Sequence, residues 1–124
     1  MCVLSKIGAP CRSACKPDPA LIRQRIAGTG VKVSERQIAP GFKTGHHKAP
    51  SDRVLFFIKG SMHWVDVNQQ TDFYLEPGDI FQVPKEVVHW AEVLGDSPVE
   101  ALMVEGDPDQ LAAAATAATG TKLD

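Results

Sequence analysis

Two stretches of this sequence decide its fold: GFKTGHHKAPSDRVLFFIKG at residues 41–60 and GDIFQVPKEVVHWAEV at residues 78–93. In the first, a glycine and a pair of histidines precede RVLFFIK, a β-prone apolar run that a glycine ends. In the second, a proline separates two short apolar segments, and a histidine lies within the later one. Both stretches therefore predict β-strands beside histidine side chains.

The β-pattern extends outward in both directions. Residues 31–39 alternate apolar and polar side chains, as a half-buried strand requires. Further strands are predicted at 61–67, 73–75 and 99–106, with glycine- and proline-containing turns between them. Seven or eight short strands at this spacing indicate an all-β sandwich or closed barrel rather than alternating strands and helices.

The two ends of the chain differ from this central part. Residues 1–30 hold several prolines and are expected to form an arm. Within the arm, residues 20–26 fit either a short helix capped by Asp18 and Pro19 or a first strand. Residues 107–124 are rich in alanine and predict a short C-terminal helix or a disordered tail. The predicted barrel domain is residues 31–106.

Composition places further bounds on function. The chain has 124 residues, enough for one domain, and a formal net charge of −2, so neither nucleic acid nor membrane is an expected partner. No uninterrupted apolar run reaches the length of a membrane span, and the N-terminus lacks a signal-peptide pattern, so a cytoplasmic location is expected. Residues 1–25 are net basic and residues 92–124 net acidic, which favours either contact between the ends or solvated tails.

The cysteines all lie near the N-terminus, at Cys2, Cys11 and Cys15. An odd number of cysteines argues against a disulfide framework, and their spacing fits no common zinc or iron–sulfur pattern. We expect free thiols, with a metal or redox role as the alternative.

The spacing of glycines, proline and histidines resembles that of the cupin superfamily. Cupin motifs read Gly-x5-His-x-His-x3-Glu-x6-Gly and Gly-x5-Pro-x-Gly-x2-His-x3-Asn. The residues of this chain that match them are Gly41, His47, Gly60, Gly78, Pro84 and His89. The resemblance implies a double-stranded β-helix, a jelly-roll-like barrel, whose motif residues point inward and often hold one divalent metal ion. It also implies a homodimer as the expected assembly.

The departures from the motifs bear on the metal. Ala49 stands at the second histidine position, Arg53 at the glutamate position and Val93 at the asparagine position. Two of the four family ligands therefore remain, and catalytic metal sites generally use about three protein ligands. If zinc, iron, nickel or manganese binds, the expected ligands are His46, His47 and His89 at an incomplete site.

Arg53 suggests a different use of the barrel. A guanidinium that points inward keeps its charge, so it needs a matching anion. A substrate carboxylate or phosphate would match it through two parallel hydrogen bonds, while an internal ion pair is the alternative. Gln82 and Trp90 are further candidates for binding a substrate.

The leading functional hypothesis is a small-molecule enzyme with acid–base chemistry of the isomerase, dehydratase or cyclase type on an anionic substrate. His47 and His89 would transfer protons, and Arg53 would hold the substrate or stabilise negative charge. The alternatives are a non-catalytic barrel that binds a small ligand and a metal-dependent oxygenase.

Overall fold

The computed structural model describes residues 11–12, 18–48, 50–83 and 85–119. Two helices and nine strands occur in these ranges. In chain order they are β1 (Cys11–Arg12), α1 (Pro19–Ile26), β2 (Lys32–Ile38), β3 (His47–Lys48), β4 (Arg53–Lys59), β5 (Ser61–Asp66), β6 (Thr71–Leu75), β7 (Asp79–Val83), β8 (Val88–Leu94), β9 (Val99–Glu105) and α2 (Pro108–Thr119).

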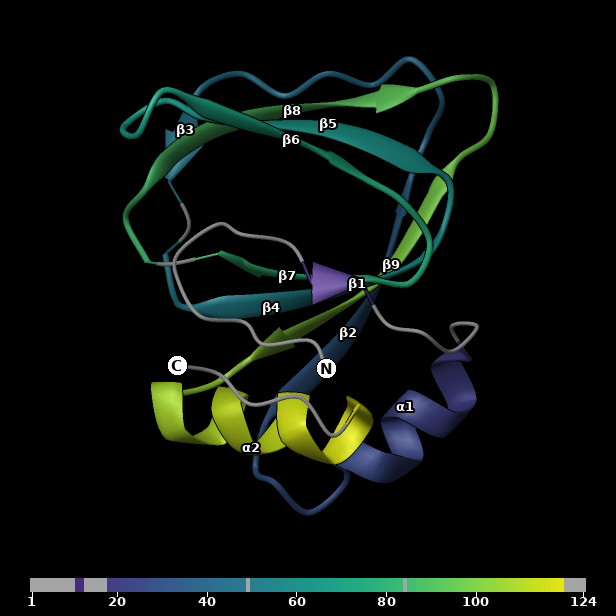
Figure 1. Cartoon of the computed structure of the whole chain (residues 1–124), viewed down its shortest axis with the longest axis vertical. Helices are drawn as coiled ribbons and strands as arrows, with labels where there is room; N and C mark the ends of the chain where they lie inside the picture. Colours follow the sequence, from purple (N-terminus) through teal and green to yellow (C-terminus); the bar gives the residue numbers. More distant parts are fainter. Residues whose placement is uncertain (1–10, 13–17, 49, 84, 120–124) are drawn as a thin grey trace.

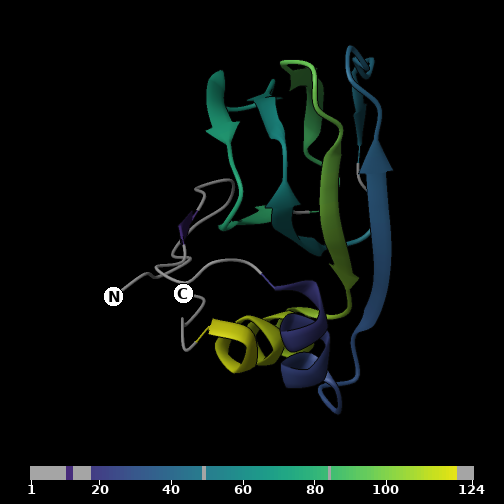
Figure 2. The same cartoon turned by 90° about the vertical axis from the view of Figure 1, so that its right-hand side faces the viewer.

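The strands form two antiparallel sheets that face one another. One sheet has the order β1-β7-β4-β9-β2 and the other the order β3-β8-β5-β6. Figure 1 shows the four-stranded sheet above the five-stranded sheet, with both helices on the far side of the latter. In the turned view of Figure 2, β2 lies at one edge of its sheet. The predicted all-β barrel with a C-terminal helix is confirmed.

Two apolar cores lie on opposite faces of the five-stranded sheet, and β4 contributes to both. Val54 and Phe56 pack toward the helices with residues such as Leu111. Phe57 packs between the two sheets, and Leu55 lies against the same core. Because neighbouring residues of a strand point to opposite faces, Arg53 belongs to the side that faces the other sheet.

The helices settle two alternatives that the sequence left open. Residues 19–26 form a helix rather than a strand, because the Asp18 carboxylate accepts hydrogen bonds from the first backbone amides and Pro19 begins the first turn. Residues 108–119 form α2. The Arg25 guanidinium donates to the carbonyl oxygen of Ala118 at 3.0 Å, so the basic arm does contact the C-terminal helix. Neither described helix is long and apolar enough to cross a membrane.

Several sequence predictions lie outside the described residues. Cys2, Cys15 and Ala49 are among them. Strands β1 and β3 were not predicted, because two residues are too few to show a period. β3 is nevertheless important, because it contains one of the motif histidines.

Gly60 shows why the first motif ends in glycine. Its φ is +82°, a left-handed conformation, in the tight connection between β4 and β5. A Cβ atom at this position would overlap the carbonyl oxygen of Pro98 and lie 2.9 Å from the Cα of Val99. Gly41 has a similar φ of +80° but has open space where a Cβ would lie.

We expect Gly60→Ala to destabilise the fold more than Gly41→Ala. Both changes carry the left-handed cost of about 1–2 kcal/mol, but only Gly60→Ala adds an overlap with backbone atoms, worth about 1–3 kcal/mol more. Urea unfolding of both variants measures the difference. Equal losses of unfolding free energy would show that the turn is free to move away from Pro98.

Candidate functional site

A cavity of about 290 Å³ lies between the two sheets. Its walls are mostly apolar, and its polar side chains come from one threonine, two histidines and two arginines. No aspartate or glutamate is among the residues that line it, which are Arg36, Ile38, Thr44, His47, Arg53, Leu55, Phe57, Met62, Trp64, Val83, His89, Ala91, Ala101 and Met103. An apolar pocket with a few placed polar groups is typical of a small-molecule site, and this set of charges favours an anion.

The two motif histidines meet at this cavity, as the sequence predicts. β3 pairs with β8 so that His47 is directly opposite His89, and the ring centroids are 4.1 Å apart. Nδ1 of His47 is 2.9 Å from the carbonyl oxygen of Gly45, and Nδ1 of His89 is 3.1 Å from that of Val87. A carbonyl oxygen only accepts hydrogen bonds, so each Nδ1 carries a proton. Each Nε2 is therefore the nitrogen available to a ligand.

His89 is the buried member of the pair, with only 3% of the residue exposed. The indole of Trp64 stacks on its ring at a centroid distance of 4.3 Å. Burial lowers the pKa of His89 below its ordinary value, and the positive charges of His47 and Arg53 lower it further. The neutral form therefore persists to lower pH than in a free histidine. Its Nε2 is then an acceptor of protons at neutral pH.

Arg53 also lines the cavity, and its one described acidic partner is Glu105. Nη2 is 3.5 Å from Oε2 of Glu105, a long contact, and that carboxylate also accepts from the hydroxyl of Ser51 at 2.8 Å. The Nε of Arg53 is buried and has no hydrogen-bond partner among the described residues. Since a buried N–H without an acceptor costs about 1–3 kcal/mol, Arg53 retains capacity to bind an anion.

Three predicted site residues do not lie at the cavity. His46 is exposed and is not part of the lining. Phe81 and Val83 pack between the sheets, so alternation turns Gln82 to the opposite face of β7. His89 and its neighbour two residues on, Ala91, point inward, and alternation turns Trp90 outward. Gln82 and Trp90 are thus not among the residues that line the cavity, and their role in binding a substrate stays a prediction.

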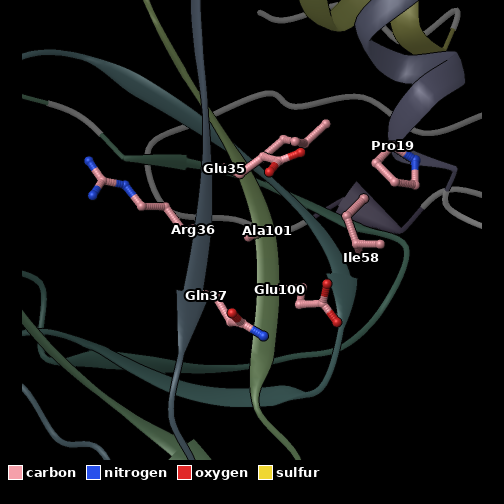
Figure 3. A pocket seen from close by; sticks show the side chains of 8 residues that line it. Pro19, Glu35, Arg36, Gln37, Ile58, Glu100 and Ala101 are labelled. Atoms are coloured by element: carbon pink, nitrogen blue, oxygen red, sulfur yellow. The ribbon is translucent and has the colours of Figure 1, made fainter.

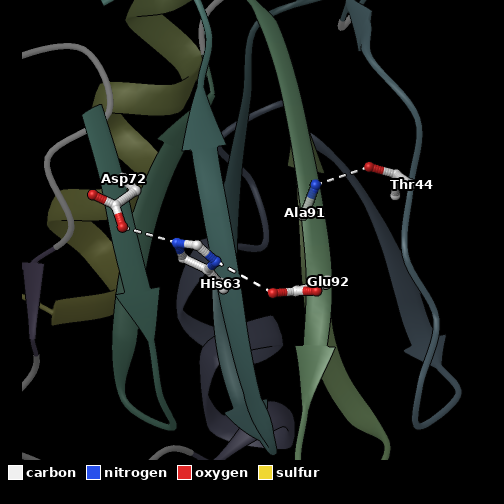
Figure 4. Close-up of polar contacts among 5 residues, drawn as sticks. All are labelled: Thr44, His63, Asp72, Ala91 and Glu92. Carbon is white, nitrogen blue, oxygen red and sulfur yellow. Dashed lines mark hydrogen bonds and ion pairs between the residues drawn. The ribbon is translucent and has the colours of Figure 1, made fainter. Parts of the chain in front are cut away.

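Trp90 belongs to a polar and aromatic cluster on the outer face of the four-stranded sheet. The ammonium of Lys43 is 4.9 Å from the Trp90 ring centroid, and the ring of His63 approaches Trp90 edge-on. The two ring nitrogens of His63 lie 2.8 Å from Asp72 and 3.4 Å from Glu92 (Figure 4). The carboxylates contact different nitrogens on opposite sides of the ring, so this cluster does not converge on one ligand.

The donor set at the cavity does not fit a catalytic metal ion. Among the described residues, no group of three or more histidine, cysteine, aspartate or glutamate side chains is arranged to hold a metal. His47 and His89 offer two imidazoles, and the predicted third ligand, His46, lies elsewhere. Catalytic zinc and iron usually need about three protein ligands, and the charge of Arg53 at the same cavity repels a cation.

Some site residues were not found from the sequence. Trp64 stacks on His89, and Thr44 fixes the neighbouring segment because its hydroxyl accepts from the amide of Ala91 at 2.9 Å (Figure 4). Arg36 reaches the cavity from β2. Neighbouring residues of a strand point to opposite faces, so Arg36 and Glu35 lie on opposite faces of β2. Once the inward face of β2 is known, this rule places Arg36 at the cavity. The pairing of Arg53 with Glu105 joins distant parts of the chain and has no local signal.

Fold and site together define a small barrel with an inward-facing pocket. Comparison with known proteins shows the family to which this barrel belongs. The cupin domain family matches residues 34–105. This chain belongs to the cupin family. Among curated proteins, no sequence matches it.

Solved structures agree on the fold. A cupin-like protein of Thermotoga maritima has 20% identity and a TM-score of 0.55, over 67% of this chain and 62% of that chain. The DMSP lyase of Ruegeria pomeroyi has 22% identity and a TM-score of 0.54, over 63% and 39%. The polyketide cyclase of Streptomyces resistomycificus has 20% identity and a TM-score of 0.54, over 60% and 53%. The match spans less than two thirds of each of these proteins.

The lowered pKa of His89 predicts that acid destabilises this protein through that residue. Above the ordinary pKa of about 6.5 both folded and unfolded states hold a neutral imidazole, and as pH falls the unfolded state takes up the proton first. The folded state therefore loses stability relative to the unfolded state as pH falls through the ordinary histidine pKa. We expect this loss to shrink in His89→Phe, which keeps an aromatic ring against Trp64.

Urea unfolding at about pH 8 and about pH 5 measures the effect, and these values bracket the ordinary histidine pKa. His46→Gln is the control, because its imidazole is exposed. If wild type and His89→Phe lose the same unfolding free energy between the two pH values, the acid destabilisation does not come from His89.

Proposed function

We propose that this cupin is a small-molecule enzyme that binds an anionic substrate between its sheets and transfers a proton with His89. The observation that carries the proposal is a buried histidine with a lowered pKa beside an arginine, in a cavity without a lining carboxylate. Perturbed titratable groups in a pocket are typical of catalytic sites.

Arg53 is suited to hold the anionic group of the substrate. It lines the same cavity as both histidines, and its contact with Glu105 is long and uses one nitrogen. A carboxylate or phosphate could accept from the remaining N–H groups of the guanidinium in the paired geometry that arginine favours. The pair with Glu105 would then orient the guanidinium.

His89 is suited to be the general base, because Nδ1 is held by the Val87 carbonyl and Nε2 is unprotonated at neutral pH. Nε2 would take a proton from carbon next to a carbonyl or carboxyl group, and the electron pair of the C–H bond would move onto the oxygen. Arg53 would stabilise that oxyanion. Return of that proton from Nε2 of His89 to a different atom completes an isomerisation, and its transfer to a departing group as the bond between carbon and that group breaks completes an elimination.

The relatives support small-molecule chemistry in this fold without specifying the reaction. The similar structures include proteins named as a DMSP lyase and a polyketide cyclase. Lyase and cyclase reactions both involve movement of protons, which the two histidines of this chain could perform. A metal-dependent oxygenase is not favoured, because the donor set offers two imidazoles beside a guanidinium.

Proton transfer is tested by exchange of substrate hydrogens in D₂O. We expect wild type to catalyse exchange of the carbon-bound hydrogens next to the carboxylate or carbonyl in a member of a panel of small keto acids and hydroxy acids, measured by NMR. His89→Gln removes the base and should slow exchange about 10²–10⁴-fold. Binding without exchange by wild type across the panel would instead identify a non-catalytic ligand-binding barrel.

Anion binding is tested separately through Arg53. Arg53→Lys keeps the charge but loses the paired hydrogen bonds, so the Kd for small carboxylates should rise by about tenfold, with Arg53→Gln weaker still. Titration calorimetry measures these constants. Lys59→Gln is the control, because Lys59 is an exposed residue outside the cavity lining, with its ammonium 3.8 Å from Glu100. Unchanged Kd values in both Arg53 variants would remove Arg53 from the site.

A further inference from the structure

Arg36 is a second arginine at the same cavity, and it comes from a different strand. It lies in β2 opposite Ala101 of β9, and both residues line the cavity. In Figure 3 the side chains of Arg36 and Glu35 extend from opposite sides of β2. Arg36 also borders a second hollow, of about 350 Å³, which lies beside Glu35 and Glu100. The residue is exposed, so it lies at the open side of the cavity.

Arg36 differs from its neighbours in having no acidic partner among the described residues. Glu35 is 3.5 Å from Arg23, and Glu100 is 3.8 Å from Lys59. The two acids that line the second hollow with Arg36 therefore already face other cations. Arg36 is left as a positive charge that an anion could neutralise at the mouth of the cavity.

The sheet register sets the separation of the two arginines. Arg53 is opposite Glu105 and Arg36 is opposite Ala101, on the two sides of β9. Four residues along a strand span about 13 Å and two strand spacings span about 9.5 Å, so the two Cα atoms lie about 16 Å apart. A single small anion could not contact both, but a short extended molecule could.

The wall between the two arginines is apolar. Leu55 and Met103 face one another across β4 and β9, and Trp64 and Ala91 face one another in the opposite sheet. All four line the cavity. Apolar walls of this kind favour the hydrocarbon part of a ligand over a polar or charged part.

We infer that the ligand carries two anionic groups joined by a short apolar segment, as in an aliphatic dicarboxylate. One anionic group binds Arg53 beside the two histidines, and the other binds Arg36 at the mouth. This inference rests on the proposed function, because it assumes that the cavity binds the substrate. It adds a substrate class and makes Arg36 a residue that determines specificity.

Titration calorimetry with matched acids tests this inference. The dicarboxylates are succinate, glutarate, adipate and pimelate, and the monocarboxylates of equal length are butyrate, pentanoate, hexanoate and heptanoate. A charged hydrogen bond at Arg36 should make the best dicarboxylate bind about tenfold or more tightly than its monocarboxylate partner. Arg36→Gln should abolish that difference, because it should weaken dicarboxylate binding much more than monocarboxylate binding. Arg53→Gln should weaken both classes.

Arg25→Gln is the matched control, because it removes the same charge from α1 outside the cavity and leaves the contact of Arg23 with Glu35 in place. If dicarboxylates bind wild type no better than monocarboxylates, or if Arg36→Gln weakens both classes equally, the inference is wrong while anion binding at Arg53 stands. If no carboxylate binds wild type, the proposed anion site fails and this inference fails with it.

Discussion

The alternation of side chains along each strand determines which residues reach the space between the two sheets. In β4 it directs Arg53 and Leu55 inward and Val54 toward the helices. In β8 it directs His89 inward and Trp90 outward. A shift of one residue would exchange these sets: in β4 it would remove Arg53 from the cavity, and in β8 it would remove His89. The apolar residues on both faces of β4 therefore fix the register of the site as well as the core.

The charges of the cavity also act on one another. Burial favours neutral His89, and the positive charges of His47 and Arg53 favour it further. A bound anion would reduce that repulsion and raise the pKa of His89 toward its ordinary value. In the proposed reaction, binding of an anionic substrate would thus make the imidazole a stronger base for the proton transfer.

Much of this arrangement could be predicted from the sequence, because it depends on local patterns. The strand from Arg53 to Lys59 follows from its β-prone apolar run, and the meeting of His47 with His89 follows from motif spacing. The outward position of Trp90 also had a local signal in its neighbour His89. The partner of Arg53 had none, since Glu105 is separated from it by 52 residues and is reached only through the pairing of β4 with β9.

The pairing of Arg53 with Glu105 also explains how this barrel departs from the motif it resembles. That motif has a glutamate where this chain has Arg53, and here a carboxylate lies on the adjacent strand, directly opposite the arginine. The acid is thus placed to balance a guanidinium instead of a metal ion. A guanidinium remains charged at any physiological pH and is part of the chain itself. The cavity therefore keeps a guanidinium at the end where both histidines lie, and the presence of this group does not depend on metal supply.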